Sequence, residues 1–352
     1  MLVNSPCHFL KPIGKTDDMN KKIIWSTLTL ILLLCTGFER EIVNPLQTYT
    51  FERMENDLIK LNKRYNGELD TVVIGRSHYG KPIYATKLGK GRKSIIVLGG
   101  HHGREWLTST LTMKMLEQYA KGYKKKAIMD GYSTSILDDV SIWFVPMVNP
   151  DGVTIQQKGV SHLPKKLQGQ LIQMNNGCKD FSRWKANGVG IDLNRQYPAG
   201  WSDIKGFASK PSYQLYKGKS PFEAAEVKSV VKFTRKIKPL AALSYHSSGR
   251  VLYWEFQEKG RELDRNRKIA KKISKMTGYK LDTPEKNAVG GGYTDWFSQE
   301  FKLPAFTPEI SYYVKDDSPP TSVFQEEWNR NKALGLFLAK EVKKIFIDEK
   351  RE

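Results

Sequence analysis

The chain has 352 residues, of which 39% are hydrophobic and 27% are charged, and this composition excludes a disordered tail, a collagen and a miniprotein. It contains 57 Lys and Arg against 37 Asp and Glu, so its formal net charge is +20, which favours anionic partners such as nucleic acid, anionic lipid or an anionic cell wall. Its three cysteines are too few for a disulfide framework in a chain of this length.

The first predicted element is an export signal. Residues 1–18 carry no such signal and are interpreted as an upstream extension. Two lysines then precede an apolar run over Ile23–Leu34, which has the length of a signal-peptide core and is shorter than the ~20 residues of a membrane-spanning helix. We therefore expect residues 19–37 to be a signal peptide cleaved near Gly37, no permanent membrane span, and a secreted or cell-wall-associated product.

Helical and apolar patterns alternate over residues 45–346, which we predict to be a single domain of the size of a catalytic domain. Apolar spacing or capping signals predict helices over Phe51–Tyr65, over Leu107–Tyr119, from Ser220 onward, over Ile269–Gly278 and at the C-terminus. Short apolar runs predict buried strands at Ser94–Leu98, Val140–Val145, Leu240–Tyr245 and Pro304–Glu309. Apolar strands separated by helices indicate an α/β fold, a three-layer α/β/α sandwich with a mostly parallel mixed sheet.

Histidine and carboxylate side chains stand at the ends of several of these strands. Ligands of such sheets bind beyond the carboxyl ends of the strands, so we expect these side chains to converge. His102 and Glu105 are three residues apart, which places them on the same side of a first helical turn, and His246 follows a later strand. Two histidines and a glutamate are a known ligand set for catalytic zinc, although a lone His-x-x-Glu pair is a weak signal and loop histidines are the alternative.

Further motifs strengthen the zinc interpretation. They follow in order and at compatible spacings: Asn149–Gly152, Asp192–Arg195, Gly291–Trp296 and Phe306–Glu309. With the histidine motif they make the chain resemble the zinc carboxypeptidase family, peptidase family M14, from about Tyr49 to about Val342. The resemblance implies a carboxypeptidase-like fold, peptidase activity, and one Zn²⁺ per chain held by His102, Glu105 and His246.

The resemblance also implies roles for other residues. Glu309 would be the catalytic general base that takes a proton from the attacking water and passes it to the leaving amine. Asp192 would orient the first zinc histidine. Arg104, Asn194 and Arg195 would contact the substrate, and the last two would bind a substrate carboxylate. For Asp192 and Arg195 the alternative is an ordinary surface ion pair.

The other histidines are not expected to bind the metal. His101 and His102 are adjacent, so one of them must point elsewhere, and the spacing of the zinc motif favours His102 as the ligand. His8, His78 and His162 have no carboxylate at metal-binding spacing and are expected at the surface.

Three positions depart from the digestive carboxypeptidases. The arginine that polarises the scissile carbonyl in those enzymes is replaced by Lys185, which can act as a point charge, with Arg183 and Arg250 as substitutes. The position of their mobile-loop tyrosine holds Asn287. The residue that helps to choose the side chain accepted in the substrate pocket is Thr294, which is neutral and polar and selects neither a large apolar nor a purely basic side chain.

Segments around Trp184, His246 and Gly290 are more similar to the bacterial branch of the family, which includes γ-D-glutamyl-L-diamino acid endopeptidases. We therefore predict an exported zinc peptidase that hydrolyses the γ-D-glutamyl-diaminopimelate bond of peptidoglycan (murein) stem peptides, with the anionic cell wall as a partner. The alternatives are a general metallocarboxypeptidase that trims C-terminal residues and an inactive cell-wall-binding protein. No recognised nucleic-acid-binding module accompanies the basic runs, so nucleic acid is not expected as a partner, and Cys178 lies in no hydrolase motif.

Overall fold

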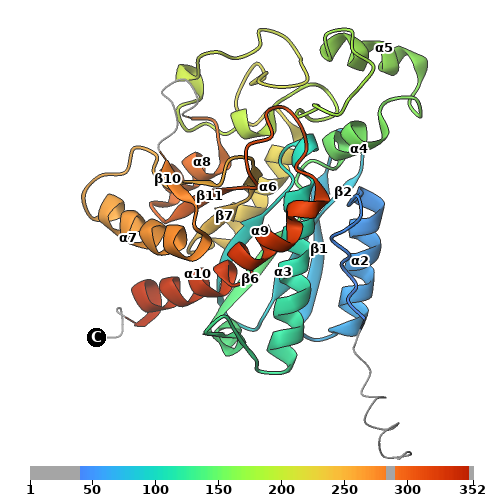
Figure 1. Ribbon diagram of the computed structural model, residues 1–352. Coiled ribbons are helices and arrows are strands. Elements are labelled where there is room, and N and C mark those ends of the chain that lie inside the picture. Colours follow the sequence, from blue (N-terminus) through green and yellow to red (C-terminus); the bar gives the residue numbers. More distant parts are fainter. Residues whose placement is uncertain (1–39, 283–289, 349–352) are drawn as a thin grey trace, which may run out of the picture. The chain divides into compact units, whose positions relative to one another are not determined.

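The computed structural model describes residues 40–282 and 290–348. These residues form one nine-stranded sheet with helices packed against it (Figure 1). In spatial order the strands are β1 (Leu69–Arg76), β2 (Pro82–Leu88), β6 (Val140–Val145), β3 (Lys93–Leu98), β7 (Ala242–Ser244), β11 (Ala305–Ile310), β9 (Val251–Tyr253) and β10 (Lys280–Asp282), with β8 (His246–Ser247) paired to β11. A separate small hairpin joins β4 (Ile128–Met129) and β5 (Tyr132–Ser133).

The centre of the sheet is parallel. Strands β6, β3, β7 and β11 run in the same direction, so their carboxyl ends meet at one edge. Strand β2 is antiparallel to β6, and β9 is antiparallel to β11, which makes the sheet mixed. The prediction of a mostly parallel mixed sheet is confirmed. The sequence identified the four central strands because strands buried on both faces are apolar throughout.

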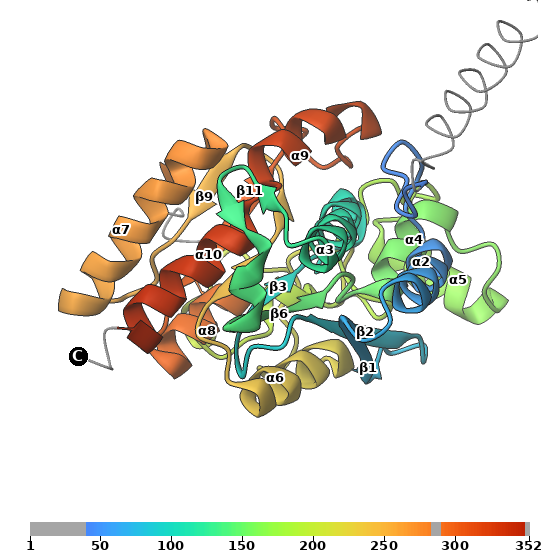
Figure 2. The same ribbon diagram turned by 90° about the horizontal axis from the view of Figure 1, so that it is seen from below.

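Helices cover both faces of the sheet, which confirms the three-layer prediction (Figure 2). One face packs against α2 (Phe51–Arg64), α3 (Leu107–Lys124), α7 (Gly260–Thr277), α9 (Phe324–Asn331) and α10 (Leu334–Lys343). The other face packs against α6 (Ala225–Ile237) and α8 (Tyr293–Phe301). Helices α4 (Pro150–Lys158) and α5 (Lys165–Met174) follow β6 at its carboxyl end.

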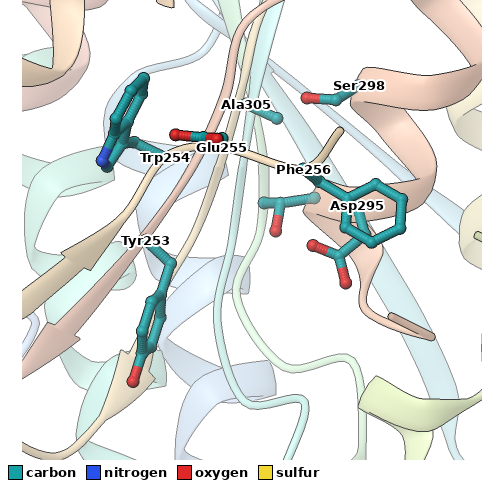
Figure 3. Close-up of a pocket in the computed structure, with 8 residues that line it drawn as sticks. Tyr253, Trp254, Glu255, Phe256, Asp295, Ser298 and Ala305 are labelled. Carbon is teal, nitrogen blue, oxygen red and sulfur yellow. The ribbon is translucent and has the colours of Figure 1, made fainter. Parts of the chain in front are cut away.

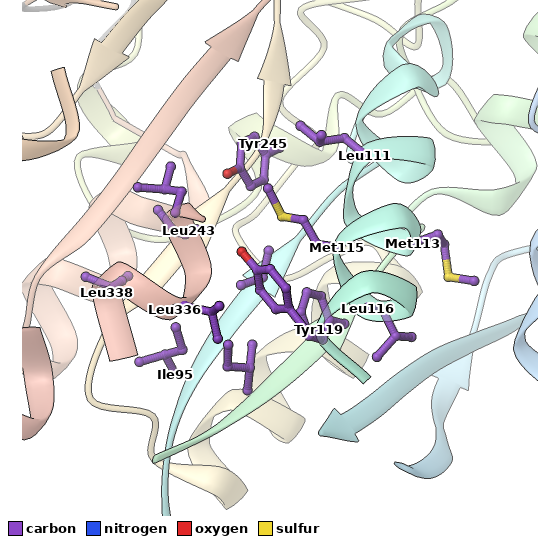
Figure 4. Packing of buried hydrophobic residues seen from close by; sticks show 14 of the residues in the cluster. Ile95, Leu111, Met113, Met115, Leu116, Tyr119, Leu243, Tyr245, Leu336 and Leu338 are labelled. Carbon is purple, nitrogen blue, oxygen red and sulfur yellow. The ribbon is translucent and has the colours of Figure 1, made fainter. Parts of the chain in front are cut away.

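The larger core cluster lies between α3 and the sheet (Figure 4). Leu111, Met115 and Tyr119 are spaced by four residues, so they share one face of α3. They belong to the same buried cluster as Ile95 of β3 and Leu243 of β7. Each buried aliphatic side chain of this kind contributes about 1.5–3 kcal/mol to folding, so the central strands are fixed firmly beneath the site that they carry.

Most predicted boundaries agree with the structure. Helix α2 covers the predicted segment to within one residue, and α7 ends at Gly278, whose φ of 71° is the left-handed conformation that favours glycine. The strand predicted over Leu240–Tyr245 is divided into β7 and β8, which lie on either side of Tyr245.

The helix predicted from Ser220 is wrong in its start. Helix α6 begins at Ala225, and no side chain caps its first turn. The buried Gln196 donates from Nε2 to the carbonyl oxygen of Ser220 and accepts from the amide of Ala224, and Phe222 has a left-handed φ of 61°. Tertiary hydrogen bonds from Gln196 therefore outweigh the local capping signal.

Within the described residues no helix is long and apolar enough to cross a membrane. The upstream extension and the signal peptide predicted over residues 1–37 lie outside the described residues.

Candidate metal centre and active site

The first two candidate ligands follow β3 at the carboxyl edge of the sheet. His102 immediately precedes η1 (Gly103–Glu105), a single 3-10 turn that leads into α3. This turn brings the two side chains together, and Nδ1 of His102 lies 2.8 Å from Oε1 of Glu105. The three-residue spacing therefore has the consequence that the sequence predicted.

Strand pairing supplies the third candidate ligand. Strand β8 is parallel to β11, and their register places His246 opposite Glu309. Nδ1 of His246 lies 2.9 Å from Oε2 of Glu105 and 3.1 Å from Nδ1 of His102. His102, Glu105 and His246 are all buried, and one ligand atom from each lies within 4.8 Å of the others.

The chemistry of this donor set fits a divalent cation. Two imidazole nitrogens and a carboxylate are the ligands that catalytic zinc sites use. Burial lowers the pKa of His246, which favours the neutral ring that a metal requires. Burial alone would raise the pKa of Glu105, but His102 and His246 hold it well below its usual range, so the carboxylate is ionised. The three residues therefore bring one negative carboxylate and two imidazole nitrogens close together.

Asp192 contacts His102 on the ring nitrogen that faces away from Glu105. Its Oδ1 lies 3.1 Å from Nε2 of His102, so the ring is assigned the tautomer that donates from Nε2 and leaves Nδ1 free as a ligand. Asp192 is buried and also accepts hydrogen bonds from the amides of Asn194 and Leu215. Burial would raise the pKa of Asp192, but the adjacent His102 and Lys185 keep it well below its usual range.

Asn149 ties the loop that carries the metal ligands to a neighbouring loop. Its Nδ2 donates to the carbonyl oxygens of His101 and Ala186, each at 3.1 Å. The amide of Gly103 in turn donates to the carbonyl oxygen of Lys185 at 3.0 Å. The two loops are therefore positioned as one unit, and Lys185 is held beside the metal ligands.

Glu309 stands next to the ligands through its register with His246. Burial raises the pKa of Glu309 to about 8, and the negative Glu105 adds to this rise. The positive charges of Lys185, Arg104 and Arg195 act in the opposite direction. The register beside His246 places the Glu309 carboxylate where it can accept and release a proton next to the metal ligands, as a general base must.

The predicted carboxylate-binding pair lies on η3 (Leu193–Arg195). The Oδ1 atom of Asn194 accepts from the amide of Tyr293, and Nη1 of Arg195 donates to the carbonyl oxygen of Asn194 at 2.9 Å. Gly291 approaches so closely that a Cβ atom there would lie 3.0 Å from Cα of Arg195. Arg195 is partly exposed, so its guanidinium can still receive a substrate carboxylate.

A small pocket, with a cavity volume of about 10 Å³, is lined by Thr294, whose hydroxyl lies 2.8 Å from that of Thr307. Figure 3 shows the pocket with Asp295 and Glu255 among its lining residues. Its lining residues come from the end of β9 and the segment after it, from α8, and from the start of β11: Tyr253, Trp254, Glu255, Phe256, Thr294, Asp295, Ser298 and Ala305. Burial raises the pKa of Asp295 to about 6. Two of the lining side chains, Glu255 and Asp295, are carboxylates, so the pocket is acidic, although its Thr294 is neutral.

Several predicted residues are engaged by other groups. Arg104 forms an ion pair with Asp316 at 2.9 Å. Arg183 donates to Asn175 and stacks on an aromatic ring, and Arg250 pairs with Glu326 and Glu327. The guanidinium groups of Arg183 and Arg250, the two predicted substitutes for Lys185, therefore already have partners within the protein.

The histidines that were not expected to bind the metal lie outside the ligand set in the described residues. The ring of His101 stacks on that of His246, but its nitrogens face other groups: Nε2 lies 3.2 Å from the hydroxyl of Tyr197 and Nδ1 lies 3.4 Å from that of Ser244. His78 and His162 are exposed, as predicted. His8 and Asn287 lie outside the described residues.

The sequence did not reveal the polar groups that hold the site together. Asp316, the amide of Leu215 and the pocket residue Glu255 belong to no recognisable motif, and only the tertiary structure brings them to the site. Asn149 stood in a recognised motif, but nothing in the sequence indicated that it joins two loops.

Comparisons with known proteins agree with this geometry. The family model described as "Zinc carboxypeptidase" matches residues 54–334. Gamma-D-glutamyl-L-diamino acid endopeptidase 1 of Lysinibacillus sphaericus is 32% identical over 301 residues, which cover 85% of this chain and 73% of that protein. Metallocarboxypeptidase A of Arthroderma otae is 33% identical over 266 residues, covering 71% of this chain and 59% of that protein. Bovine thrombin-activatable fibrinolysis inhibitor, in complex with tick carboxypeptidase inhibitor, shares the fold with a TM-score of 0.66 and 21% identity, covering 86% and 99% of the two chains.

Replacing Asp192 by Ala should weaken zinc binding about 10- to 100-fold, because His102 loses the acceptor that fixes its tautomer. Competition with a chromogenic chelator measures the affinity. The exposed Asp203, replaced by Ala, is the matched control and should bind zinc as the parent does. Equal affinities of the two variants would remove Asp192 from the metal site.

Replacing Gly103 by Ala should destabilise the protein by about 1–3 kcal/mol, because the new Cβ would lie 2.5 Å from the carbonyl oxygen of Gly152 and 2.7 Å from that of Trp184. Gly169 on α5 has no atom within 4 Å of such a Cβ, so Gly169→Ala should be neutral or stabilising. Urea unfolding of both variants tests the contrast, and equal midpoints would show that the loop packing is not rigid.

Proposed function

This chain belongs to the zinc carboxypeptidase family, and on that basis we propose that it cleaves the bond between γ-D-glutamate and the diamino acid of peptidoglycan stem peptides. Membership of the family makes it a zinc-dependent metallopeptidase. The observation that carries the narrower proposal is the 32% identity, over 85% of this chain, with a protein named gamma-D-glutamyl-L-diamino acid endopeptidase 1.

The residues around the metal centre can perform peptide hydrolysis. His102, Glu105 and His246 would hold the zinc ion, which would supply the Lewis acidity that lowers the pKa of water and polarises a carbonyl group. Glu309 lies opposite His246 on the neighbouring strand β11. From there its carboxylate can accept a proton from the attacking water and deliver it to the leaving amine. Lys185 brings a positive charge to the side of the developing oxyanion.

Two features of the substrate side support a diamino acid as the leaving residue. Arg195 is partly exposed and suits a carboxylate, which the diamino acid carries. The adjoining pocket offers the carboxylates of Glu255 and Asp295, which suit the amine at the end of a lysine or diaminopimelate side chain. Asp295 already accepts a hydrogen bond from the amide of Gly292, so Glu255 is the carboxylate that such an amine would pair with.

The same proposal includes export and association with the wall. The predicted signal over residues 19–37 would direct secretion, and the formal charge of +20 would attract the chain to an anionic wall polymer.

General carboxypeptidase activity is the second candidate. It is supported by the 33% identity with metallocarboxypeptidase A of Arthroderma otae, of which this chain spans 59%. The two candidates differ in the bond that is cleaved, so product identity separates them.

The products formed from L-Ala-γ-D-Glu-diaminopimelate-D-Ala by zinc-loaded protein should be L-Ala-γ-D-Glu and diaminopimelate-D-Ala, because the acidic pocket and Arg195 would hold the diamino acid. Mass spectrometry of the reaction identifies them. An α-linked peptide with a free C-terminus should remain intact. Stepwise loss of its C-terminal residues would establish the general carboxypeptidase instead, and no cleavage of either would indicate an inactive wall-binding protein.

Replacing Glu309 by Gln should lower kcat by about 10²- to 10⁴-fold on whichever substrate is cleaved, because the proton acceptor is lost while the three ligands remain. Zinc content should stay near one per chain. Glu262→Gln on α7 is the matched control and should keep full activity. Loss of zinc from the Glu309 variant would show that this glutamate is a ligand rather than a base.

A further inference from the structure

The segment after β11 is fastened to the rim of the metal centre. The amide of Val314 donates to the hydroxyl oxygen of Ser248 at 2.9 Å, and the carbonyl oxygen of Ser311 accepts from the amide of Gly249. Asp316 pairs with Arg104 at 2.9 Å. Ser248 follows His246 by two residues and Arg104 precedes Glu105, so each of these contacts is made beside a metal ligand. Figure 1 shows this segment as a red loop between β11 and α9.

Two neighbouring tyrosines on this segment face solvent. Tyr312 is 50% exposed and Tyr313 is 71% exposed. Large exposed hydrophobic side chains are otherwise scattered over the described residues, at Leu46, Ile59, Val73, Ile128 and Phe207. Single exposed apolar residues are ordinary, whereas two consecutive exposed aromatic residues beside an active site are a candidate binding surface.

The tyrosines lie away from the carboxylate-binding side of the site. Asn194 and Arg195 are fastened to Gly291 and Tyr293, whereas the tyrosine segment is fastened to Ser248 and Arg104. If Arg195 receives the carboxylate of the leaving residue, the amino-terminal part of the substrate extends toward the other side. In a wall stem peptide, the amino-terminal residue is joined to an amino sugar of the glycan strand.

We propose that Tyr312 and Tyr313 form a subsite that binds the glycan end of the substrate by stacking on a pyranose ring. This inference rests on the proposed peptidoglycan substrate and adds a requirement to it, namely that the sugar attached to the stem peptide contributes to recognition. A tyrosine ring suits a sugar because it combines an apolar face with a polar hydroxyl group and costs little conformational entropy to order.

The charges of the segment favour a neutral ligand over a polyanion. Lys315 is flanked by Asp316 and Asp317, and Asp316 is the residue that pairs with Arg104. A phosphate-rich polymer would need an excess of positive charge here, which these three residues do not provide. An uncharged ring that stacks on the tyrosines meets no such penalty.

The test compares two substrates that differ only in the sugar. One is the stem tetrapeptide with a disaccharide of N-acetylglucosamine and N-acetylmuramic acid attached, and the other is the free tetrapeptide. The parent protein should have a kcat/KM about 5- to 50-fold higher on the sugar-bearing substrate. In the double variant Tyr312→Ala, Tyr313→Ala this ratio should fall to near 1, whereas Tyr312→Phe, Tyr313→Phe should keep it. Ile128→Ala, which removes an exposed apolar side chain of β4, should also keep the parent ratio.

The other outcomes contradict the proposal. An equal loss on both substrates would show that the segment acts only on the geometry of the metal centre. A preserved ratio would show that the tyrosines do not contact the sugar, and a ratio lowered equally by the Phe variant would assign recognition to the hydroxyl groups instead of stacking.

If the parent cleaves neither substrate, the proposed function fails. Calorimetric binding of the disaccharide to the Glu309→Gln protein then decides on the subsite alone, and the absence of binding would overturn it.

Discussion

The site depends on a buried carboxylate that is held between two imidazoles. Both oxygens of Glu105 are occupied, one by His102 and the other by His246. An ionised carboxylate in a protein interior is costly unless opposite charge compensates it, and a divalent cation compensates the carboxylate while it satisfies both ring nitrogens. Because Glu105 and His246 are 141 residues apart in the chain, only the parallel pairing of the central strands can bring them together.

Hydrogen bonds that involve the backbone then fix the orientation of the ligand side chains. Asp192 fixes one ring and is itself fixed by two amides, while Asn149 joins the two loops beside it. The charged group, Asp192, faces a metal ligand, whereas the loops are joined by the neutral side-chain amide of Asn149. Lys185, which lowers the pKa of both Asp192 and Glu309, is partly exposed.

The parts that could be predicted from the sequence are those with a local signal. The central strands were found because they are apolar throughout, and His102 and Glu105 were found because one helical turn relates them. Strand β1 at one edge of the sheet and strand β9 next to the other edge have partly exposed faces and gave no such run. The start of α6 was wrong because Gln196, more than twenty residues away, holds that segment, and Glu255 was missed because its pocket is assembled from three separate elements. Long-range contacts of this kind leave no periodic trace in a single sequence.

Strand β11 carries Glu309 and separates the acidic pocket from the two exposed tyrosines. Its antiparallel pairing with β9 places Tyr253 opposite Thr307, so the acidic pocket lies toward the beginning of β11, whereas Tyr312 and Tyr313 lie beyond its end. The six residues of β11 span about 17 Å, and Glu309 stands near the far end of that span. A single C-terminal residue that contacts the pocket therefore cannot also reach the tyrosines. A substrate that contacts both must be long, with a charged group at the pocket and a ring at the tyrosines. The proposed substrate, a stem peptide that is still attached to its sugar, has both parts.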